Sequence, residues 1–528
     1  MTTSTSSMSD AFHVYDTTLR DGAQREGLSL SVNDKLAIAR HLDDLGVGFI
    51  EGGWPGANPK DAEFFRRART ELTLRTAQLA AFGSTRRAGG DVAADLAHLR
   101  DSGAGVVTLV AKSDVRHVER ALRTTREENL AMVRDSVAHL RAEGQRVFLD
   151  AEHFFDGYVA DPAYALEVLR VATEAGADVV ALCDTNGGML PSRLAAIVHE
   201  VVATGMRVGI HAHNDAACAV ANSLAAIDAG ATHVQGTANG YGERSGNADL
   251  FSIVAALENK LGQQVLPVGR LAELGRVAHA IAEVANIAPD SHQPWVGASA
   301  FAHKAGLHVS AIKADPDLYQ HADPAVVGND MRLLVSELAG RATIELKGKA
   351  IGLEPDRDAV ARVLERVKDL ESVGYSFEAA EASFELLLRE EMGQRPSYFD
   401  LESWRVIVEQ RADGVVSEAT VKLHAKGERI VATGEGNGPV NALDNALRSA
   451  LEKLYPGLAN LELVDYKVRI VSGAHGTDAV TRVLVETSDG TTEWDTVGVH
   501  ENVIAASWQA LEEAYTTGLL RAGQESAD

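Results

Sequence analysis

The chain has 528 residues, of which 45% are hydrophobic and 24% are charged, values that are ordinary for a globular protein. Its formal net charge of −25 argues against a nucleic-acid partner, because phosphate groups are contacted by clustered Lys and Arg. The two cysteines, Cys183 and Cys218, do not make a disulfide framework of the kind that staples small secreted domains. The length predicts about three to four domains, or fewer if one of them is a large α/β barrel.

The N-terminal segment, MTTSTSSMSD, is polar and lacks the basic and apolar regions of a secretory signal peptide. No apolar run in the sequence approaches the length of about 20 residues that a membrane span requires. We therefore expect a cytoplasmic protein with no membrane partner and a short disordered leader at residues 1–11.

Short β-like runs alternate with Ala- and Leu-rich helical stretches from residue 12 to about residue 240. Several runs follow a glycine of the kind that ends a helix, as in AGA at 175–177 and at 229–231. Eight runs at this spacing match a (β/α)₈ TIM barrel in number and size. The runs are 12–16, 47–53, 78–84, 106–112, 147–153, 179–185, 208–214 and 233–239.

Most of these runs are apolar in the middle and turn polar at the carboxyl end, as at Glu51, Glu152 and Asp184. The carboxyl ends of barrel strands carry the active site, so these side chains are expected to converge on one mouth. Capping of the following helix explains any one of them, but explains so many at once poorly.

Two histidines stand one residue apart near the end of the seventh run. In an extended strand, His211 and His213 point the same way with Cα atoms about 6.6 Å apart, so one metal ion could accept both. Taken alone, such a pair is more often structural. Asp21 in the first loop supplies a carboxylate, and Asn247 could add an amide oxygen. Two imidazoles and one carboxylate leave open positions on a divalent ion.

Such a ligand set can hold a 2-oxo acid and polarise its carbonyl group. Arg20, next to Asp21, offers a fixed cation for a substrate carboxylate or an oxyanion, unless it forms a surface ion pair. Thr185 could donate its hydroxyl to the same carboxylate, and spacing does not rank the carboxylates at the strand ends. The ligand trio also suits a non-haem iron oxygenase, although nothing else in the sequence resembles one.

The region from about 265 to 390 is mainly helical and is broken by prolines, which is typical of a linker. It carries His303, His308 and Tyr319 among small residues. The last section alternates like strands at 403–408, 415–424, 466–471 and 479–487.

A weak internal repeat with an offset of 64 residues relates Gly434 to Gly498 and Ala446 to Ala510. The repeat predicts a small α+β domain with pseudo-twofold symmetry. The glycine turn at 434–438 is similar to a phosphate loop but lacks the Lys-Ser/Thr that follows one, which favours an ordinary turn before a helix.

Three motifs together resemble the signatures of the acyl-CoA condensing enzymes that include 2-isopropylmalate, homocitrate and citramalate synthases. They are DTTLRDG at 16–22, HAHND at 211–215 and NGYGERSGN at 239–247. The resemblance covers nearly the whole chain and implies an α/β architecture in three parts. These are a catalytic TIM barrel at 12–285, helical linker subdomains at 286–394 and a C-terminal α+β regulatory domain at 395–528.

Four further segments are similar to the citramalate synthase branch of this family, in its longer bacterial type. They are IEGGWPGANPK at 50–60, AFGSTRR at 81–87, DAEHFFDG at 150–157 and GYSFEAAEASF at 374–384. The similarity implies a metal-dependent Claisen condensation of acetyl-CoA with pyruvate, followed by hydrolysis to (R)-citramalate and CoA, in isoleucine biosynthesis. The 2-isopropylmalate and homocitrate synthase activities stay open as alternatives.

The resemblance also implies a metal site for Mn²⁺, Mg²⁺ or Zn²⁺. Its ligands would be Asp21, His211, His213 and Asn247, whereas Asp16 would be structural. Substrate contacts would come from Arg20, Glu152 and Thr185. We add the hypothesis that Trp54 fills the space that a larger oxo acid would need.

His308, Tyr319 and Glu243 would be the acid and base candidates, with His308 favoured as the base that takes a methyl proton from acetyl-CoA. The C-terminal domain would bind an end-product amino acid, isoleucine, near the glycine turn at 434–438. The family further implies a homodimer.

Three other functions use some of the same features. A metal-dependent acyl-CoA lyase and a biotin-dependent carboxyltransferase share the Arg-Asp-Gly and His-x-His elements, but the section from 395 onward argues against both. An amino-acid-binding regulatory protein on an inactive barrel is a third, and the intact Arg20, Asp21, His211 and His213 argue against it.

Overall fold

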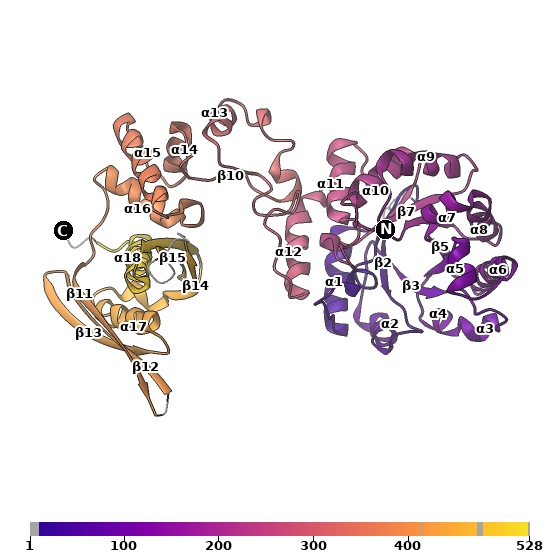
Figure 1. The fold of residues 1–528 in the computed structure, drawn as a ribbon, viewed down its shortest axis with the longest axis horizontal. Helices are drawn as coiled ribbons and strands as arrows, with labels where there is room; N and C mark the ends of the chain where they lie inside the picture. The colour runs from indigo at the N-terminus through magenta and orange to yellow at the C-terminus, as the bar shows by residue number, and fades with distance from the viewer. Residues whose placement is uncertain (1–9, 413, 472–478, 526–528) are drawn as a thin grey trace, which may run out of the picture. The chain divides into compact units, whose positions relative to one another are not determined.

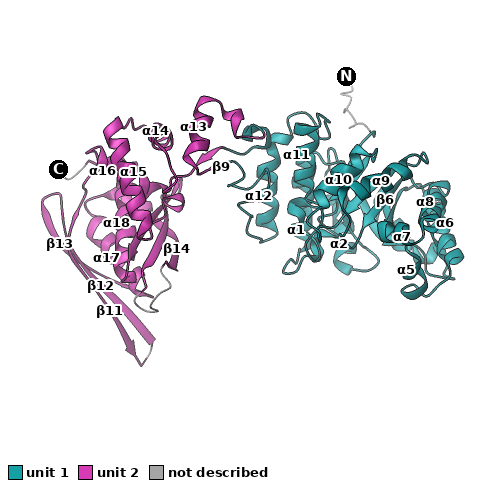
Figure 2. Ribbon diagram, turned by 45° about the horizontal axis from the view of Figure 1, so that its top comes forward, with its two compact units in different colours: residues 1–301, 322–330 teal, residues 302–321, 331–528 magenta. Residues whose placement is uncertain are grey.

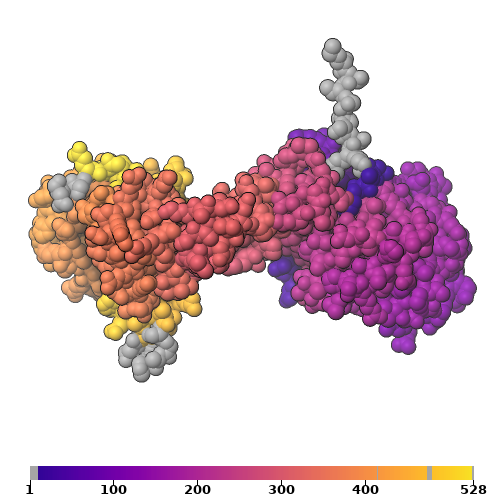
Figure 3. Space-filling model, turned by 90° about the horizontal axis from the view of Figure 1, so that it is seen from above, coloured from indigo at the N-terminus to yellow at the C-terminus, as the bar shows by residue number. Residues whose placement is uncertain are grey.

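The computed structural model describes residues 10–412, 414–471 and 479–525. The predicted leader therefore lies largely outside the described residues. The chain divides into two compact units, one of residues 1–301 with 322–330 and the other of residues 302–321 with 331–528 (Figure 2). Figure 3 draws the chain as a space-filling surface, coloured by residue number. Among the described residues, no helix is both long and apolar enough to cross a membrane.

The first unit is a closed barrel of eight parallel strands in sequence order, which confirms the predicted (β/α)₈ fold (Figure 1). The strands are β1 (His13–Asp16), β2 (Phe49–Gly53), β3 (Gln78–Ser84), β4 (Val106–Lys112), β5 (Arg146–Glu152), β6 (Val179–Asp184), β7 (Val208–Ala212) and β8 (His233–Gly236). The helices are α1 (Val32–Leu45), α2 (Pro59–Glu71), α3 (Val92–Asp95), α4 (Ala97–Asp101), α5 (Val115–Arg120), α6 (Arg126–Ala142), α7 (Phe154–Ala160), α8 (Pro162–Glu174), α9 (Pro191–Val202), α10 (Ala219–Asp228), α11 (Leu250–Lys260) and α12 (Leu274–Val284).

Helix α1 illustrates how the sequence delimits the outer layer. The Ser31 side chain accepts from the backbone N–H of Asp34 at 3.2 Å, and the Asp34 carboxylate accepts from the N–H of Ser31 at 2.7 Å, a capping box. Gly46, at φ +99°, ends the helix in the left-handed conformation that glycine adopts without strain. Leu36 and Leu42 are buried between these ends, so α1 packs its apolar face on the barrel.

The interior of the barrel is filled with side chains rather than open. Tyr15, Phe49 and Phe148 pack there with Val106, and all four are almost completely buried. The ring centroids of the three aromatic residues lie 5.3–6.1 Å apart. This layer closes the barrel below the carboxyl ends of the strands, where the polar side chains gather.

The second unit begins with helices α13 (Gly306–Ala314), α14 (Arg341–Ala350), α15 (Arg357–Ser372) and α16 (Glu381–Glu391), with short strands β9 (Ala302–His303) and β10 (Arg332–Leu333). Two modules of three antiparallel strands and one helix follow. The first is β11 (Asp400–Arg411), β12 (Gly414–Ala425), β13 (Glu428–Gly436) and α17 (Pro439–Leu451). The second is β14 (Glu462–Ile470), β15 (Thr481–Ser488), β16 (Glu493–His500) and α18 (Val503–Arg521).

The internal repeat corresponds to one close helix–strand approach in each module. A Cβ at Gly434 on β13 would lie 2.4 Å from the backbone nitrogen of Ala446 on α17. A Cβ at Gly498 on β16 would lie 2.0 Å from the carbonyl oxygen of Ala506 on α18. Only glycine allows a helix backbone this near, which explains why both copies of the repeat have glycine at this position.

Candidate active site

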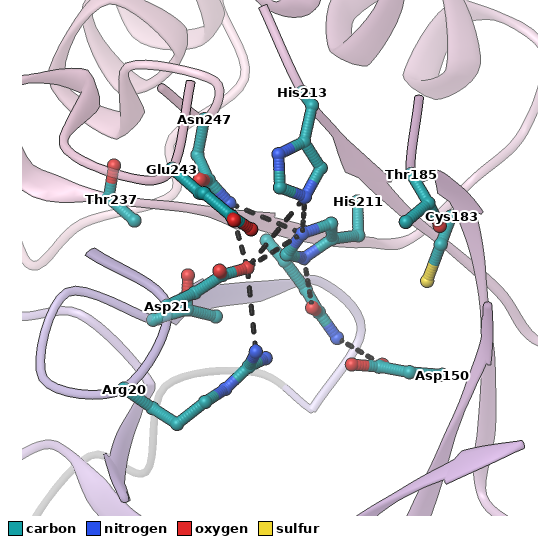
Figure 4. Close-up of polar contacts among 12 residues, drawn as sticks. Arg20, Asp21, Asp150, Cys183, Thr185, His211, His213, Thr237, Glu243 and Asn247 are labelled. Atoms are coloured by element: carbon teal, nitrogen blue, oxygen red, sulfur yellow. Dashed lines mark hydrogen bonds and ion pairs between the residues drawn. The ribbon is translucent and has the colours of Figure 1, made fainter. Parts of the chain in front are cut away.

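Three predicted ligands meet at the mouth of the barrel (Figure 4). Nε2 of His211 lies 3.2 Å from Nε2 of His213, and Oδ2 of Asp21 lies 3.1 and 3.9 Å from these two atoms. All three residues are buried. Asp21 follows β1, whereas His211 lies on β7 and His213 just after it, so barrel closure brings together residues from opposite ends of the unit.

The spacing of these atoms fits a divalent ion. Bonds of about 2.0–2.2 Å to oxygen and nitrogen place neighbouring ligand atoms about 3 Å apart or slightly more. Asn247 extends the cluster, because its amide nitrogen lies 3.0 Å from Oδ2 of Asp21 and 3.2 Å from Nε2 of His211. The Asn247 Oδ1 atom is buried and has no hydrogen-bond partner among the described residues. Rotating the amide by 180° would turn this oxygen toward the other ligand atoms.

The pKa values of these side chains are compatible with a role as metal ligands. Burial and the nearby His211 lower the pKa of His213 to about 4, so its imidazole is neutral. Burial opposes ionisation of Asp21, but Arg20 and the two histidines hold the pKa of its carboxyl well below the usual range. Burial also opposes protonation of His211, yet its contact with Asp21 raises the His211 pKa. An ion would compete with that proton for Nε2.

Arg20 is held in one orientation beside the cluster. Its Nε donates to Oε2 of Glu51 at 2.6 Å, and its guanidinium lies 3.8 Å above the ring of Phe82. An outer nitrogen lies 3.5 Å from Oδ2 of Asp21. The hydroxyl of Tyr15 also donates to Glu51, at 2.9 Å. The Arg20 side chain is only 13% exposed and is paired with a fully buried carboxylate, so the alternative of an ordinary surface ion pair does not hold.

A cavity of about 610 Å³ extends from the cluster. Trp54 lines it and meets Phe82 edge-on, with ring centroids 5.4 Å apart. Thr185 also lines it, and its hydroxyl oxygen accepts from the backbone N–H of His153 at 2.9 Å. That bond leaves the Thr185 hydroxyl hydrogen free to donate to a ligand in the cavity.

Two of the predicted acidic residues lie on the cavity wall in different settings. Glu152 forms an ion pair with Lys112, which also lines the cavity. Glu243 is exposed, and its nearest charged neighbour is Arg244 at 3.9 Å. Both carboxylates lie on the cavity wall, and Glu152 has the closer cation of the two.

His308 and Tyr319 belong to the second compact unit. They stack on one another, with ring centroids 4.1 Å apart. His308 lies in the first turn of α13, and Tyr319 follows the turn Pro316–Leu318. Two of the three acid and base candidates are therefore in direct contact within the second unit.

Asp16 stands apart from this chemistry. Its carboxylate accepts from the backbone N–H of Thr18 at 2.9 Å and from the Thr18 hydroxyl at 2.8 Å. Burial raises the pKa of its carboxyl to about 7. Asp16 therefore shapes the loop that presents Asp21.

Three residues of the site had no assigned role from sequence. Gln235 accepts from His211, Asp150 in turn accepts from Gln235, and Arg244 binds Asp215 and the backbone oxygen of Thr185. Strand alternation could have found Gln235, because it shares a face with His233 on β8. No sequence signal pointed to the partner of Arg244.

The closed (β/α)₈ barrel and the cluster at its mouth identify the class of protein. It is a barrel enzyme whose site is suited to a divalent metal ion. The chain belongs to the HMGL-like family, whose model matches residues 11–279, and within it to the branch of the citramalate synthases. The model of the homocitrate synthase post-HMGL domain matches residues 295–374. The model of the LeuA allosteric (dimerisation) domain matches residues 378–519.

Curated relatives match over almost the entire length. The (R)-citramalate synthase of Streptomyces coelicolor is 69% identical, with 100% of each chain covered. The (R)-citramalate synthase of Synechocystis is 50% identical over 96% of each chain, and that of Aquifex aeolicus is 48% identical over 98% of this chain and 99% of its own. The family resemblance drawn from the motifs is confirmed.

Proposed function

We propose that the chain condenses acetyl-CoA with pyruvate and hydrolyses the product to (R)-citramalate and CoA. The observation that carries this proposal is the cluster of Asp21, His211 and His213 with the fixed guanidinium of Arg20 beside it. A 2-oxo acid needs an electrophilic site for its keto oxygen and a cation for its carboxylate or the charge that develops, and this mouth offers both.

A divalent ion such as Mn²⁺, Mg²⁺ or Zn²⁺, held by Asp21, His211, His213 and Asn247, would supply Lewis acidity toward the keto oxygen. The Thr185 hydroxyl donates to the pyruvate carboxylate. Trp54 limits the space beside the pyruvate methyl group.

The chemical step needs a base, a new carbon–carbon bond and a hydrolysis. His308 removes a proton from the methyl group of acetyl-CoA, and the enolate carbon attacks the keto carbon of pyruvate. Arg20 stabilises the negative charge that develops on oxygen, and an acid, for which Tyr319, Glu152 and Glu243 are the candidates, protonates the alkoxide. Water then cleaves the thioester, and CoA leaves as the thiol.

The C-terminal modules suit a regulatory amino acid. A cavity of about 760 Å³ lies among residues of α17 and the turn before it, of β14 and of the start of α18. Its wall includes Gly438, Asp444, Arg448, Tyr466 and Ile504. Apolar side chains with a carboxylate and a guanidinium match an amino acid with a branched side chain. We assign isoleucine to this site.

A second copy of the chain is the proposed partner of the C-terminal sheets. Val408 on β11 and Val415 on β12 are 55% and 56% exposed, and Ile470 on β14 of the other sheet is 63% exposed, which is unusual for β-branched side chains on strands. Pairing of two such faces would bury them and gives the homodimer that the matching dimerisation model suggests.

Thiol release from acetyl-CoA tests the reaction, with pyruvate, 2-oxoisovalerate and 2-oxoglutarate compared side by side. We expect metal-dependent release with pyruvate, and loss of release in His211→Ala and His213→Ala. A preference for 2-oxoisovalerate would replace pyruvate as the substrate while leaving the family intact. Thiol release that is unaffected by chelation would contradict the metal site.

A further inference from the structure

A buried amide lies directly beneath the metal-site cluster. Gln235 on β8 pairs in register with His211 on β7 and with Tyr15 on β1, and its side chain has no exposed surface. Barrel interiors are filled mainly by apolar side chains, so a fully buried amide at this depth requires specific partners.

The contacts of Gln235 assign its two ends. Its Nε2 lies 2.8 Å from Oδ1 of Asp150, and its Oε1 lies 2.8 Å from Nδ1 of His211 (Figure 4 labels Asp150 and His211). A carboxylate only accepts, so the group that faces Asp150 is the NH₂. The oxygen therefore faces His211, and Nδ1 of His211 must carry a hydrogen to donate to it.

The second hydrogen of the amide also has a partner. Nε2 of His233 lies 3.3 Å from Nε2 of Gln235, and Nδ1 of His233 lies 3.2 Å from Nδ1 of His13. Burial lowers the pKa of both imidazoles, that of His13 to about 4, so both are neutral and Nε2 of His233 can accept a hydrogen from the Gln235 amide. Both ends of the amide therefore have partners, and exchanging them would turn the amide oxygen toward the Asp150 carboxylate.

We propose that Gln235 is a positioning residue that, with Asp150 behind it, keeps the hydrogen of His211 on Nδ1 and so leaves the Nε2 lone pair for the metal. The inference rests on the proposed metal site and names the device that prepares it. A histidine that binds a metal through one nitrogen usually donates through the other, which fixes both tautomer and ring orientation. In this barrel an amide replaces the usual carboxylate or carbonyl, and the carboxylate stands one step further back.

The first test measures the dissociation constant of Mn²⁺ at pH 7.5 from the EPR signal of the free ion, with full-length protein. Gln235→Met keeps the side-chain volume but removes the acceptor, and we expect affinity to fall about 10–100-fold. Val106→Ala is the matched control, because Val106 packs with the buried aromatic residues of the same interior and its loss opens space there. We expect its Mn²⁺ affinity to stay within about threefold of wild type.

A second variant protects the test against misfolding of Gln235→Met. Gln235→Glu combined with Asp150→Asn exchanges amide and carboxylate, so the charge of the pair is unchanged and His211 still meets an acceptor. We expect Mn²⁺ affinity within about threefold of wild type. Loss of affinity in this double variant, undiminished affinity in Gln235→Met, or equal losses in Gln235→Met and Val106→Ala would each overturn the inference. Wild-type protein that binds no Mn²⁺ would instead contradict the proposed function.

Discussion

Arg20 and Glu51 form a largely buried ion pair in which Nε and Oε2 are 2.6 Å apart. They come from the first loop of the barrel and from β2, and Glu51 is completely buried. A buried cation without its partner is unfavourable, so the pair must be kept intact if Arg20 is to face the cavity. Glu51 thus orients the Arg20 guanidinium toward the cavity.

Replacing Glu51 with Gln tests this relationship. The amide can still accept one hydrogen bond, but Arg20 loses the charge of its nearest carboxylate, so we expect kcat/KM for pyruvate to fall about 10–100-fold because the guanidinium is misplaced. Unfolding free energy should fall by up to about 3–5 kcal/mol. Steady-state kinetics and denaturant unfolding measure the two effects. Glu63→Gln, which removes an exposed pair with Arg66, should leave both kcat/KM and the unfolding free energy close to the wild-type values.

Trp54→Ala tests the substrate-size hypothesis. Loss of the indole that meets Phe82 opens the cavity wall, so the ratio of kcat/KM for 2-oxoisovalerate to that for pyruvate should rise about tenfold or more. Leu122→Ala changes another part of the same cavity and should leave the ratio unaltered. An unchanged ratio in Trp54→Ala would remove this residue from the selectivity of the site.

Arg448→Ala tests the proposed isoleucine cavity. Hydrogen bonds from a guanidinium to a carboxylate contribute about 1.5–3 kcal/mol, so the isoleucine concentration for half inhibition should rise about 10–100-fold while uninhibited turnover persists. Lys453→Ala, an exposed cation just beyond the end of α17, is the control. Inhibition that is equally sensitive in both variants would show that isoleucine, if it acts, binds elsewhere.

Glu513 predicts a pH dependence of stability in the second unit. Burial raises the pKa of its carboxyl to about 7, above the value near 4.5 of an unfolded chain. The unfolded state releases this proton first as pH rises, so stability should decrease between about pH 4.5 and 7 and then level off. Glu513→Gln keeps an acceptor for the Ser383 hydroxyl but cannot ionise. Its melting temperature should therefore fall less than that of wild type from pH 5 to pH 8, measured by scanning calorimetry.

Much of the barrel could be predicted from local patterns. All eight predicted runs overlap the barrel strands, because glycine-ended helices and buried strands leave a signal that needs no knowledge of partners. The C-terminal prediction found β11, β12, β14 and β15 but missed β13 and β16. Segments such as ERIVATGEG in β13 alternate weakly and carry several polar or small residues, so their strand character comes from pairing with β12.

The sequence by itself determined the fold class, the family and the residues that gather at the mouth, because Asp21, His211 and His213 follow motifs that are local in the chain. It could not determine what holds them. That Glu51 orients Arg20, that Lys112 pairs with Glu152 and that Gln235 links His211 to Asp150 depends on barrel closure. Alternation along a strand tells which face a side chain occupies, but depth, rotamer and partner are decided only when strands far apart in sequence become neighbours.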